Sequence, residues 1–401
     1  MIKRNVMLKS ITIKNFKSIE SMHLELGRIN LFLGANGCGK SNILEALGIV
    51  SSAVYGIVDD ETLLRRGVRP GVPKLYKTSN KKRTRQPHIS FDVEAANGCE
   101  YHVSLLNPLE NPKPQWSYKT ERFVDSGKND SYVVGVKTNK NPAAGGMPGV
   151  LNDYEVESPE EQFIRTLREY AIYNPNTPML RGLVSDPQNR LPVGLSGGGL
   201  AEGLLDLLVL GMDDEYIEDA LTDVISLFPW VKRVGSETNI GAIVSGSVPR
   251  PKRVVTFIDE YMKDSANKFS ASDASEGILY ALFLAVLCLS KEGPKMFSVD
   301  NIDQALNPRI IQRLMGQMKE WFEELIPEKQ ILCTAHNPAI LDNWISSDDS
   351  VRLFIVDRDS DGLTVVKRFI ITEELIKLSQ EKHISLSRMW VDGYLGGVPN
   401  V

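Results

Sequence analysis

Residues 34–41 read GANGCGKS, which matches the pattern G-x-x-x-x-G-K-[ST] at every fixed position. The apolar run RINLFL at 28–33 comes directly before this stretch, and the helical pattern NILEALGIVSSAV at 42–54 comes directly after it. Glycines let such a turn fold back so that successive backbone N–H groups face one anion. A strand, a glycine-rich loop and a helix in this order predict a loop that binds nucleotide phosphates.

Each residue of this loop is a candidate ligand of the nucleotide. We expect Lys40 to reach the β- and γ-phosphates and the hydroxyl of Ser41 to hold Mg²⁺. The helix that follows presents its positive N-terminal end to the same anion. ATP and Mg²⁺ are therefore the expected cofactors. The predicted phosphate-binding residues are Gly34, Ala35, Asn36, Gly37, Cys38, Gly39, Lys40, Ser41 and Asn42.

The segments outside the loop predict an α/β fold. Apolar and charged residues alternate over 11–26, which is typical of an antiparallel hairpin. Near the other end, MFSVD at 296–300, an amphipathic helical pattern at 308–325 and QILCTAH at 330–336 form a strand–helix–strand crossover. Such crossovers join parallel strands in sheets that helices cover. A last hairpin is expected at 351–369, with its turn at Asp361-Gly362.

The middle of the chain predicts an inserted α+β lobe. Two strands joined at Asn97-Gly98 are expected within 88–106, since this dipeptide favours hairpin turns. A loop rich in Lys, Asn, Gly and Pro follows at 125–149 and is interpreted as mobile. Helical patterns resume at 159–170, 199–210 and 215–228. The expected domains are an N-terminal ATPase lobe at 1–70, the insertion at 71–254 and a C-terminal ATPase lobe at 255–401.

Three polar residues near the C-terminal strands are candidates for the chemistry. Asp300 ends an apolar strand and is the candidate Walker B carboxylate, which holds the metal. His336 follows the next strand and can sense the γ-phosphate or orient the attacking water. The alternatives are an aspartate that caps a turn and a solvated loop histidine. Asp303 is the nearest further carboxylate.

Ser275, Glu276 and Gly277 open a strongly apolar helix about two dozen residues before Asp300. A serine and a glycine at a helix N-terminus are suited to bind a phosphate, although a plain helix cap has the same pattern. The sequence LSGGG at 195–199 also resembles an ABC signature, but it lies about a hundred residues before Asp300. We interpret it as a glycine-rich turn that leads into a helix.

Composition excludes several other classes of protein. The chain has 401 residues, 42% of them apolar and 24% charged, and a net charge of −5, so no overall attraction to nucleic acid is expected. The four cysteines are scattered, which argues against disulfides and structural zinc and fits a reducing cytoplasm. The longest apolar run, 278–289, is too short to span a bilayer. We expect a cytoplasmic protein with no membrane contact.

Five segments together resemble the AAA-family ATPases of the RecF, SMC and OLD-like ABC group: ITIKNFKSI at 11–19, GANGCGKSN at 34–42, ASEGILYALFLAVL at 274–287, FSVDNIDQALNP at 297–308 and TAHNPAIL at 334–341. The resemblance implies an ATP sandwich in a head-to-head homodimer or higher oligomer, with Ser41 and Asp300 on Mg²⁺. It also implies that Ser275 and Gly277 cap ATP in trans, that 305–307 form a D-loop and that His336 is the switch histidine.

Asn301 is the one serious departure from the family pattern, which has glutamate after the Walker B aspartate. An amide can orient water but cannot take its proton at neutral pH. Slow hydrolysis is therefore expected, unless Asp303 acts as the base.

Three functions remain open at this point. The OLD-like resemblance favours an ATPase sensor that controls a partner nuclease or toxin in bacterial anti-phage defence. The basic run at 81–85 would suit a RecF-like ATPase that binds DNA, although such a run is more often a solvated loop. An ATP-dependent scaffold is the third possibility. The last segment, 385–401 with Trp390, is either a docking segment for a partner or a packed tail.

Overall fold

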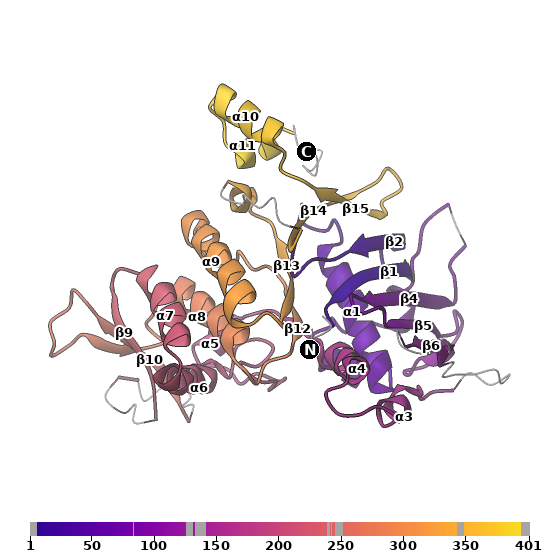
Figure 1. Ribbon diagram of the computed structural model, residues 1–401, viewed down its shortest axis with the longest axis horizontal. Coiled ribbons are helices and arrows are strands. Elements are labelled where there is room, and N and C mark those ends of the chain that lie inside the picture. Colours follow the sequence, from indigo (N-terminus) through magenta and orange to yellow (C-terminus); the bar gives the residue numbers. More distant parts are fainter. Residues whose placement is uncertain are drawn as a thin grey trace. The chain divides into compact units, whose positions relative to one another are not determined.

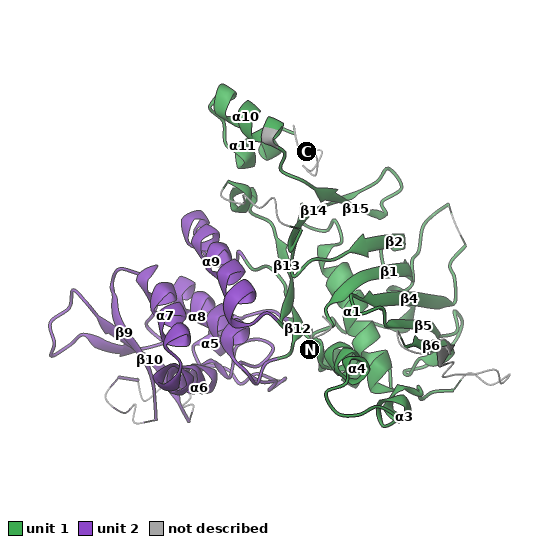
Figure 2. Ribbon diagram, viewed as in Figure 1, with its two compact units in different colours: residues 1–172, 294–302, 328–401 green, residues 173–293, 303–327 purple. Residues whose placement is uncertain are grey.

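The computed structural model describes residues 6–82, 84–125, 131–132, 142–238, 241, 243–244, 252–342 and 349–393. The chain divides into two compact units, drawn in green and purple in Figure 2. The first unit holds residues 1–172, 294–302 and 328–401, and the second holds residues 173–293 and 303–327. The stretch interpreted as an insertion, 71–254, contributes residues to both units.

The first unit contains a mixed sheet with the strand order β15-β14-β3-β13-β12-β8 (Figure 1). Strands β12, β13, β3 and β14 pair in parallel, and β15 pairs with β14 in the antiparallel sense. Every residue of β3, β12 and β13 is buried, which explains their mostly apolar sequences. In sheet order the strands span Thr364–Phe369, Val351–Arg358, Ile29–Leu33, Gln330–Ala335, Met296–Val299 and Ile172–Tyr173.

A second, antiparallel sheet in the same unit has the order β2-β1-β4-β5-β6-β7. Alternate residues of its strands point inward, so that Ile11, Ile13 and Phe91 are fully buried. The predicted turn at Asn97-Gly98 joins β4 to β5, with Gly98 at a φ of 90°. In chain order these strands span Leu8–Phe16, Ile19–Glu25, His88–Ala95, Glu100–Leu106, Ser117–Val124 and Ser131–Tyr132.

Helix α1 (Lys40–Tyr55) lies in the core that both sheets of this unit share. It contacts strand β1 of the antiparallel sheet and strand β13 of the mixed sheet. Because α1 contacts both sheets and further helices, most of its residues are buried. Three further helices pack against α1, namely α2 (Asp60–Leu64), α3 (Met147–Leu151) and α4 (Pro159–Glu169).

The C-terminal part of this unit ends in two helices, α10 (Glu373–Lys382) and α11 (Leu386–Val391). Helix α11 packs on the short helix η3 (Pro338–Leu341). The backbone N–H and the hydroxyl of Ser387 both donate to the carboxylate of Asp342, each at 2.7 Å. Trp390 is buried, which supports the packed alternative for this part of the tail, while residues 394–401 lie outside the described residues.

The second unit is mainly helical, with a small antiparallel sheet of order β11-β10-β9. Helix α8 is buried from Ile278 to Leu289, because this apolar helix has no polar side to expose. Helix α9 begins at Pro308 and continues into a π-helical turn, η2, at Trp321. The elements are α5 (Thr177–Leu180), α6 (Leu200–Asp213), α7 (Glu215–Ser226), β9 (Val231–Glu237), β10 (Val254–Asp259), β11 (Lys268–Ser270), α8 (Glu276–Leu289), α9 (Pro308–Glu320) and η2 (Trp321–Leu325).

The structure confirms the α/β fold and most of the predicted elements. The first hairpin, the P-loop with its strand and helix, the parallel crossover and the hairpin that turns at Asp361-Gly362 are all present. The LSGGG stretch forms turns that lead into α6, as interpreted. The predicted mobile loop lies largely outside the described residues. None of the helices in the described ranges is both long and apolar enough to cross a membrane.

Candidate nucleotide-binding site

The loop between β3 and α1 requires glycine at several places. Gly37 and Gly39 have φ angles of 79° and 110°, in the region that side chains disfavour. At Gly34 an added Cβ would lie 2.2 Å from the carbonyl oxygen of Val356 on the neighbouring strand β14. The glycines of the motif therefore provide both the tight turn and the close approach to the sheet.

Lys40 begins α1 and turns back over the loop. Its Nζ lies 2.7 Å from the carbonyl oxygen of Gly34, 2.9 Å from that of Ala35 and 3.0 Å from Nδ1 of His336. The residue is only 4% exposed. The ammonium group is thus fixed within the loop that is predicted to hold the phosphates, which is the position that charge stabilisation of a γ-phosphate needs.

Ser41 and Asp300 meet, although 259 positions separate them in the sequence. The Ser41 hydroxyl lies 2.9 Å and 3.1 Å from the two carboxylate oxygens of Asp300. A hydroxyl and a carboxylate at the same place suit Mg²⁺, which takes few protein ligands and completes its octahedron with water and phosphate oxygens. The chemistry of these two side chains therefore fits the expected magnesium ion.

Thr334 fixes the end of strand β12, and sequence reasoning did not single it out. Its fully buried hydroxyl donates to Asp300 Oδ1 at 2.5 Å and accepts from the backbone N–H of Asn301 at 2.8 Å. Its carbonyl oxygen also accepts from the N–H of Ile302 at 2.9 Å. One residue of β13 thus positions three consecutive residues after β12.

Asn301 and His336 form a direct contact. Asn301 has a φ of 59°, a left-handed conformation that asparagine tolerates better than most residues. Its Oδ1 lies 2.6 Å from Nε2 of His336. Because the Lys40 ammonium can only donate, Nδ1 of His336 accepts, and Nε2 carries the proton donated to Asn301. The histidine is therefore held as a neutral ring with its orientation fixed from both sides.

A buried glutamate within α1 supports the loop from below and was missed in the sequence. Glu45 is 2% exposed and pairs with Lys17 and with Arg69, whose Nε lies 2.6 Å from the carboxylate. Burial alone would raise the pKa of Glu45, but its hydrogen bonds and charge contacts with Arg69 and Lys17 lower it. Arg69 also donates to Asn42 Oδ1 at 3.1 Å. Glu45 is the single charged residue in the apolar run NILEALGIV, and this isolated charge was the sequence signal that could have indicated a buried ion pair.

The β14–β15 hairpin also contacts the loop. The Thr364 hydroxyl donates to the carbonyl oxygen of Cys38 at 2.7 Å, and Arg358 Nε donates to that of Gly37 at 2.9 Å. Burial raises the pKa of the Cys38 thiol, so this residue is a packed apolar group of the loop. Neither hairpin contact is visible from sequence spacing, because more than 300 positions separate the partners.

The other predicted site residues belong to the second unit. Ser275 is the N-cap residue of α8 but makes no side-chain capping bond, and Glu276 begins the helix. At Gly277 an added Cβ would lie 3.3 Å from the carbonyl oxygen of Ala305, so this position is tight. Asp303 is also in this unit, and Asn307 caps α9 by accepting from the N–H of Ile310 at 3.0 Å. The first unit thus assembles the P-loop, Asp300, Asn301 and His336.

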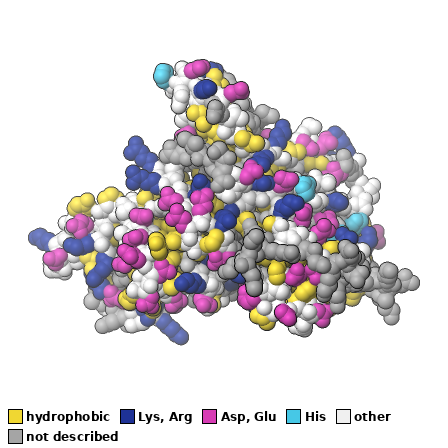
Figure 3. Space-filling view, in the orientation of Figure 1, with side chains coloured by type: hydrophobic (Ala, Val, Ile, Leu, Met, Phe, Trp, Pro, Cys, Tyr) yellow, Lys and Arg dark blue, Asp and Glu magenta, His cyan; other side chains and the backbone are white. Residues whose placement is uncertain are grey.

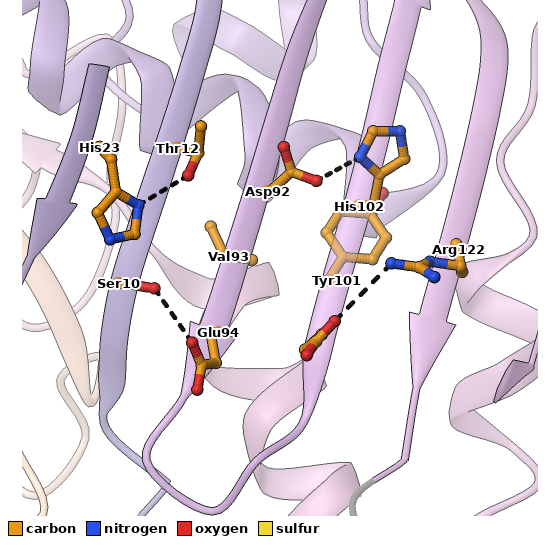
Figure 4. Close-up of a pocket in the computed structure, with 10 residues that line it drawn as sticks. Ser10, Thr12, His23, Asp92, Val93, Glu94, Tyr101, His102 and Arg122 are labelled. Atoms are coloured by element: carbon orange, nitrogen blue, oxygen red, sulfur yellow. Dashed lines mark hydrogen bonds and ion pairs between the residues drawn. The ribbon is translucent and has the colours of Figure 1, made fainter. Parts of the chain in front are cut away.

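A separate polar hollow of about 200 Å³ lies on the antiparallel sheet (Figure 4). His102 Nδ1 lies 2.6 Å from Asp92 Oδ1, and His23 Nδ1 lies 2.9 Å from the Thr12 hydroxyl. The hydrogen bond from His102 lowers the pKa of Asp92. No residue of the predicted nucleotide site lines this hollow, so the hollow is distinct from that site.

Charged side chains and potential metal ligands also occur outside the predicted nucleotide site. Acidic and basic side chains are interspersed over the face seen in Figure 3. Within the described part of the chain, no three or more His, Cys, Asp or Glu residues form a group that could hold a metal ion. All four cysteines are buried, and none forms a disulfide.

Comparisons with known proteins identify the family of this chain. The sequence profile of the family described as "AAA domain, putative AbiEii toxin, Type IV TA system" matches residues 29–342. The uncharacterized protein MJECL10 of Methanocaldococcus jannaschii is 30% identical over 142 residues, which are 32% of this chain and 61% of that protein. RecF, the DNA replication and repair protein of Leifsonia xyli, is 29% identical over 101 residues, 25% of this chain and 26% of RecF. The matches thus span less than two thirds of either relative.

Solved structures agree with the fold assignment. An SMC head bound to the C-winged helix domain of ScpA superposes with a TM-score of 0.52 and covers 90% of this chain and 98% of its own. The sequence identity is 14%, so the likeness concerns the fold alone.

Proposed function

Because this chain belongs to the AAA family whose profile spans residues 29–342, and is an ABC-type ATPase of the RecF and SMC group, we propose that it is an ATP-dependent switch that controls a separate effector protein. ATP binds along residues 34–42, with Mg²⁺ on Ser41 and Asp300. Binding joins two copies, with Ser275, Glu276 and Gly277 of one copy placed over the ATP of the other. Hydrolysis is slow and resets the assembly.

The observation that carries this proposal is the contact between Asn301 and His336. The amide oxygen of Asn301 accepts a hydrogen bond from Nε2 of His336 at 2.6 Å, so neither group is arranged as a strong proton acceptor for water. A well-placed general base contributes about 10²- to 10⁴-fold to a rate. Without that contribution, the ATP-bound assembly persists long enough to act as a signal.

Replacement of Asn301 by glutamate tests this role directly. In Asn301→Glu, we expect phosphate release to rise by about 10²-fold or more, because a carboxylate can accept the proton of water. The left-handed backbone costs the glutamate about 1 kcal/mol, which thermal unfolding would register separately. Asp303→Asn is the matched control, because it removes the other candidate base and should leave the rate unchanged. Fast turnover by the parent protein, or no gain in Asn301→Glu, contradicts the proposal.

A role in bacterial defence against phages is the setting we propose for the switch. The family description refers to a putative toxin of a type IV toxin–antitoxin system, which supports a place in such a two-protein system. The SMC head that shares this fold was solved with a domain of another protein, which supports control through a bound partner. A nuclease or toxin encoded beside this protein that co-purifies with it in an ATP-dependent manner is the expected finding. An isolated chain that cleaves nucleic acid by itself argues against a separate effector.

A DNA-binding repair ATPase is the second candidate, because proteins named RecF are among the relatives. Lys81 and Lys82 of the basic run are exposed, and Arg85 is half-buried. Lys82 pairs with Asp361, and Arg85 donates to the Ser79 hydroxyl, so part of this charge is already engaged within the protein. DNA binding that requires ATP, weakens steeply with salt and is lost in Lys81→Ala/Arg85→Ala favours this candidate. Salt-independent or absent binding favours the effector switch.

A further inference from the structure

Helices α6 and α7 of the second unit carry an unusual concentration of negative charge. Residues 191–230 contain no lysine, arginine or histidine. The same stretch contains eight carboxylates: Glu202, Asp206, Asp213, Asp214, Glu215, Glu218, Asp219 and Asp223. Lys291 approaches one of them, Asp214, at 3.9 Å from outside the stretch. The pair of helices therefore presents a strongly acidic surface on a chain whose net charge is only −5.

Helix α6 has two apolar sides, whereas a surface helix needs only one apolar side to pack on the rest of the protein. Leu200, Leu204 and Leu207 are buried and form the side that packs within the unit. A second stripe with the spacing i, i+3, i+4 and i+7 lies on another side of the helix. It consists of Leu205, Leu208, Val209 and Met212.

This second stripe is exposed and continues onto α7. Met212 is 81% exposed, Val209 is 51% exposed, and Tyr216 in the first turn of α7 is 71% exposed. Leu205 and Leu208 are half-buried. Single exposed apolar residues are common, but three exposed and two half-buried apolar residues along one helix and the first turn of the next are of the kind that binds other proteins. We name Leu205, Leu208, Val209, Met212 and Tyr216 the α6–α7 stripe.

We propose that the α6–α7 stripe is the docking surface for a basic amphipathic helix of a partner protein. Apolar residues at this spacing match the apolar face of a second helix. The carboxylates beside the stripe, among them Asp206, Asp213 and Asp219, complement lysine and arginine on the partner. The same carboxylates repel nucleic-acid phosphates and the acidic α6–α7 surface of a second copy. The inference rests on the second unit alone and holds whether or not the nucleotide switch operates as proposed.

Binding of synthetic peptides to the full chain tests the proposal. The probes are a fluorescently labelled 18-residue amphipathic helix of leucine and lysine and its counterpart of leucine and glutamate, followed by fluorescence anisotropy. We expect the leucine–lysine peptide to bind and the leucine–glutamate peptide not to bind. The triple variant Val209→Ser/Met212→Ser/Tyr216→Ser, which keeps every charge, should weaken binding at least tenfold. Neutralisation of the flanking carboxylates in Asp206→Asn/Asp213→Asn/Asp219→Asn should weaken it to a similar extent.

Matched controls separate docking from general charge attraction. Leu75→Ser/Val156→Ser/Ile370→Ser removes three equally exposed apolar residues of the first unit and should leave binding unchanged. Lys40→Ala should also leave peptide binding unchanged, so a failed nucleotide switch does not imitate a failed docking surface. Equal binding by the parent and the serine variant of the stripe overturns the proposal. A parent dimer that dissociates in Met212→Ser overturns it as well, because the occupant would then be a second copy.

Discussion

Thr334→Val should separate the metal site from the rest of the nucleotide site. Valine keeps the shape of the buried side chain but removes the hydroxyl that donates to Asp300 and accepts from the N–H of Asn301. The lost bond to a carboxylate, together with the unpaired N–H, corresponds to about 2–3 kcal/mol of unfolding free energy. Groups that orient a metal ligand typically change metal affinity by about 10- to 100-fold. We therefore expect a loss of that size in the Mg²⁺ affinity that supports ATP binding.

The assay titrates Mg²⁺ into the protein with a fluorescent ATP analogue, beside a thermal unfolding experiment. Thr334→Ser is the matched control, since it loses a methyl group but retains the hydroxyl, and it should keep the parental Mg²⁺ dependence. If Thr334→Val and Thr334→Ser require the same Mg²⁺ concentration, Thr334 is a packing residue and its proposed positioning of Asp300 is wrong.

Three further predictions concern groups in the core of the first unit. Glu45→Gln should lower the unfolding free energy by about 3 kcal/mol at pH 7, because it leaves the half-buried Lys17 without its charge partner. Since the pKa of Glu45 is lowered from 4.5, its contribution to the unfolding free energy is present above pH 4.5 and is lost as the pH falls through the pKa of the folded state. The stability of Glu45→Gln should therefore fall less with decreasing pH than that of the parent. Burial raises the pKa of Glu121 to about 7, so its contribution to the unfolding free energy is present below pH 4.5 and falls by about 3 kcal/mol as the pH rises towards 7. Glu121→Gln should therefore be more stable relative to the parent at pH 8 than at pH 5. An identical difference in stability at both pH values would refute this. Gly34→Ala should abolish binding of the ATP analogue, because its Cβ would lie 2.2 Å from a backbone oxygen, and normal binding would show that the loop can shift.

The sequence predicted the parts of the site that are local in the chain. The P-loop was recognisable because strand, glycines and helix are contiguous from Ile29 to Tyr55. The spacing of the glycines also predicts the tight backbone turn of a phosphate-binding loop. Asp300 and His336 were recognisable because each follows a buried apolar strand. In a parallel crossover, the carboxyl ends of such strands lie at one edge of the sheet.

The contacts that complete the site depend on register and packing, which a single sequence does not display. Thr334 meets Asp300 only because β12 and β13 pair with Val299 opposite Cys333. The bond from Arg69 to Glu45 crosses 24 positions and has no periodic signal. The two units could not be predicted either, because each is built from separated segments of the chain. Asparagine at position 301 lacks the carboxylate of a general base, but it also suits the left-handed backbone at this position, which is a separate physical reason for its presence.

The central claim, that ATP assembles this protein and is hydrolysed slowly, is tested most directly by the mass of the purified protein in solution with and without Mg²⁺-ATP. Phosphate release is followed in the same samples, and Lys40→Ala serves as the control that cannot hold the phosphates. The account predicts a dimer or larger assembly with Mg²⁺-ATP, little released phosphate, and a monomer in Lys40→Ala under all conditions. A parent protein that binds ATP but stays monomeric, or that releases phosphate rapidly while assembled, would contradict it.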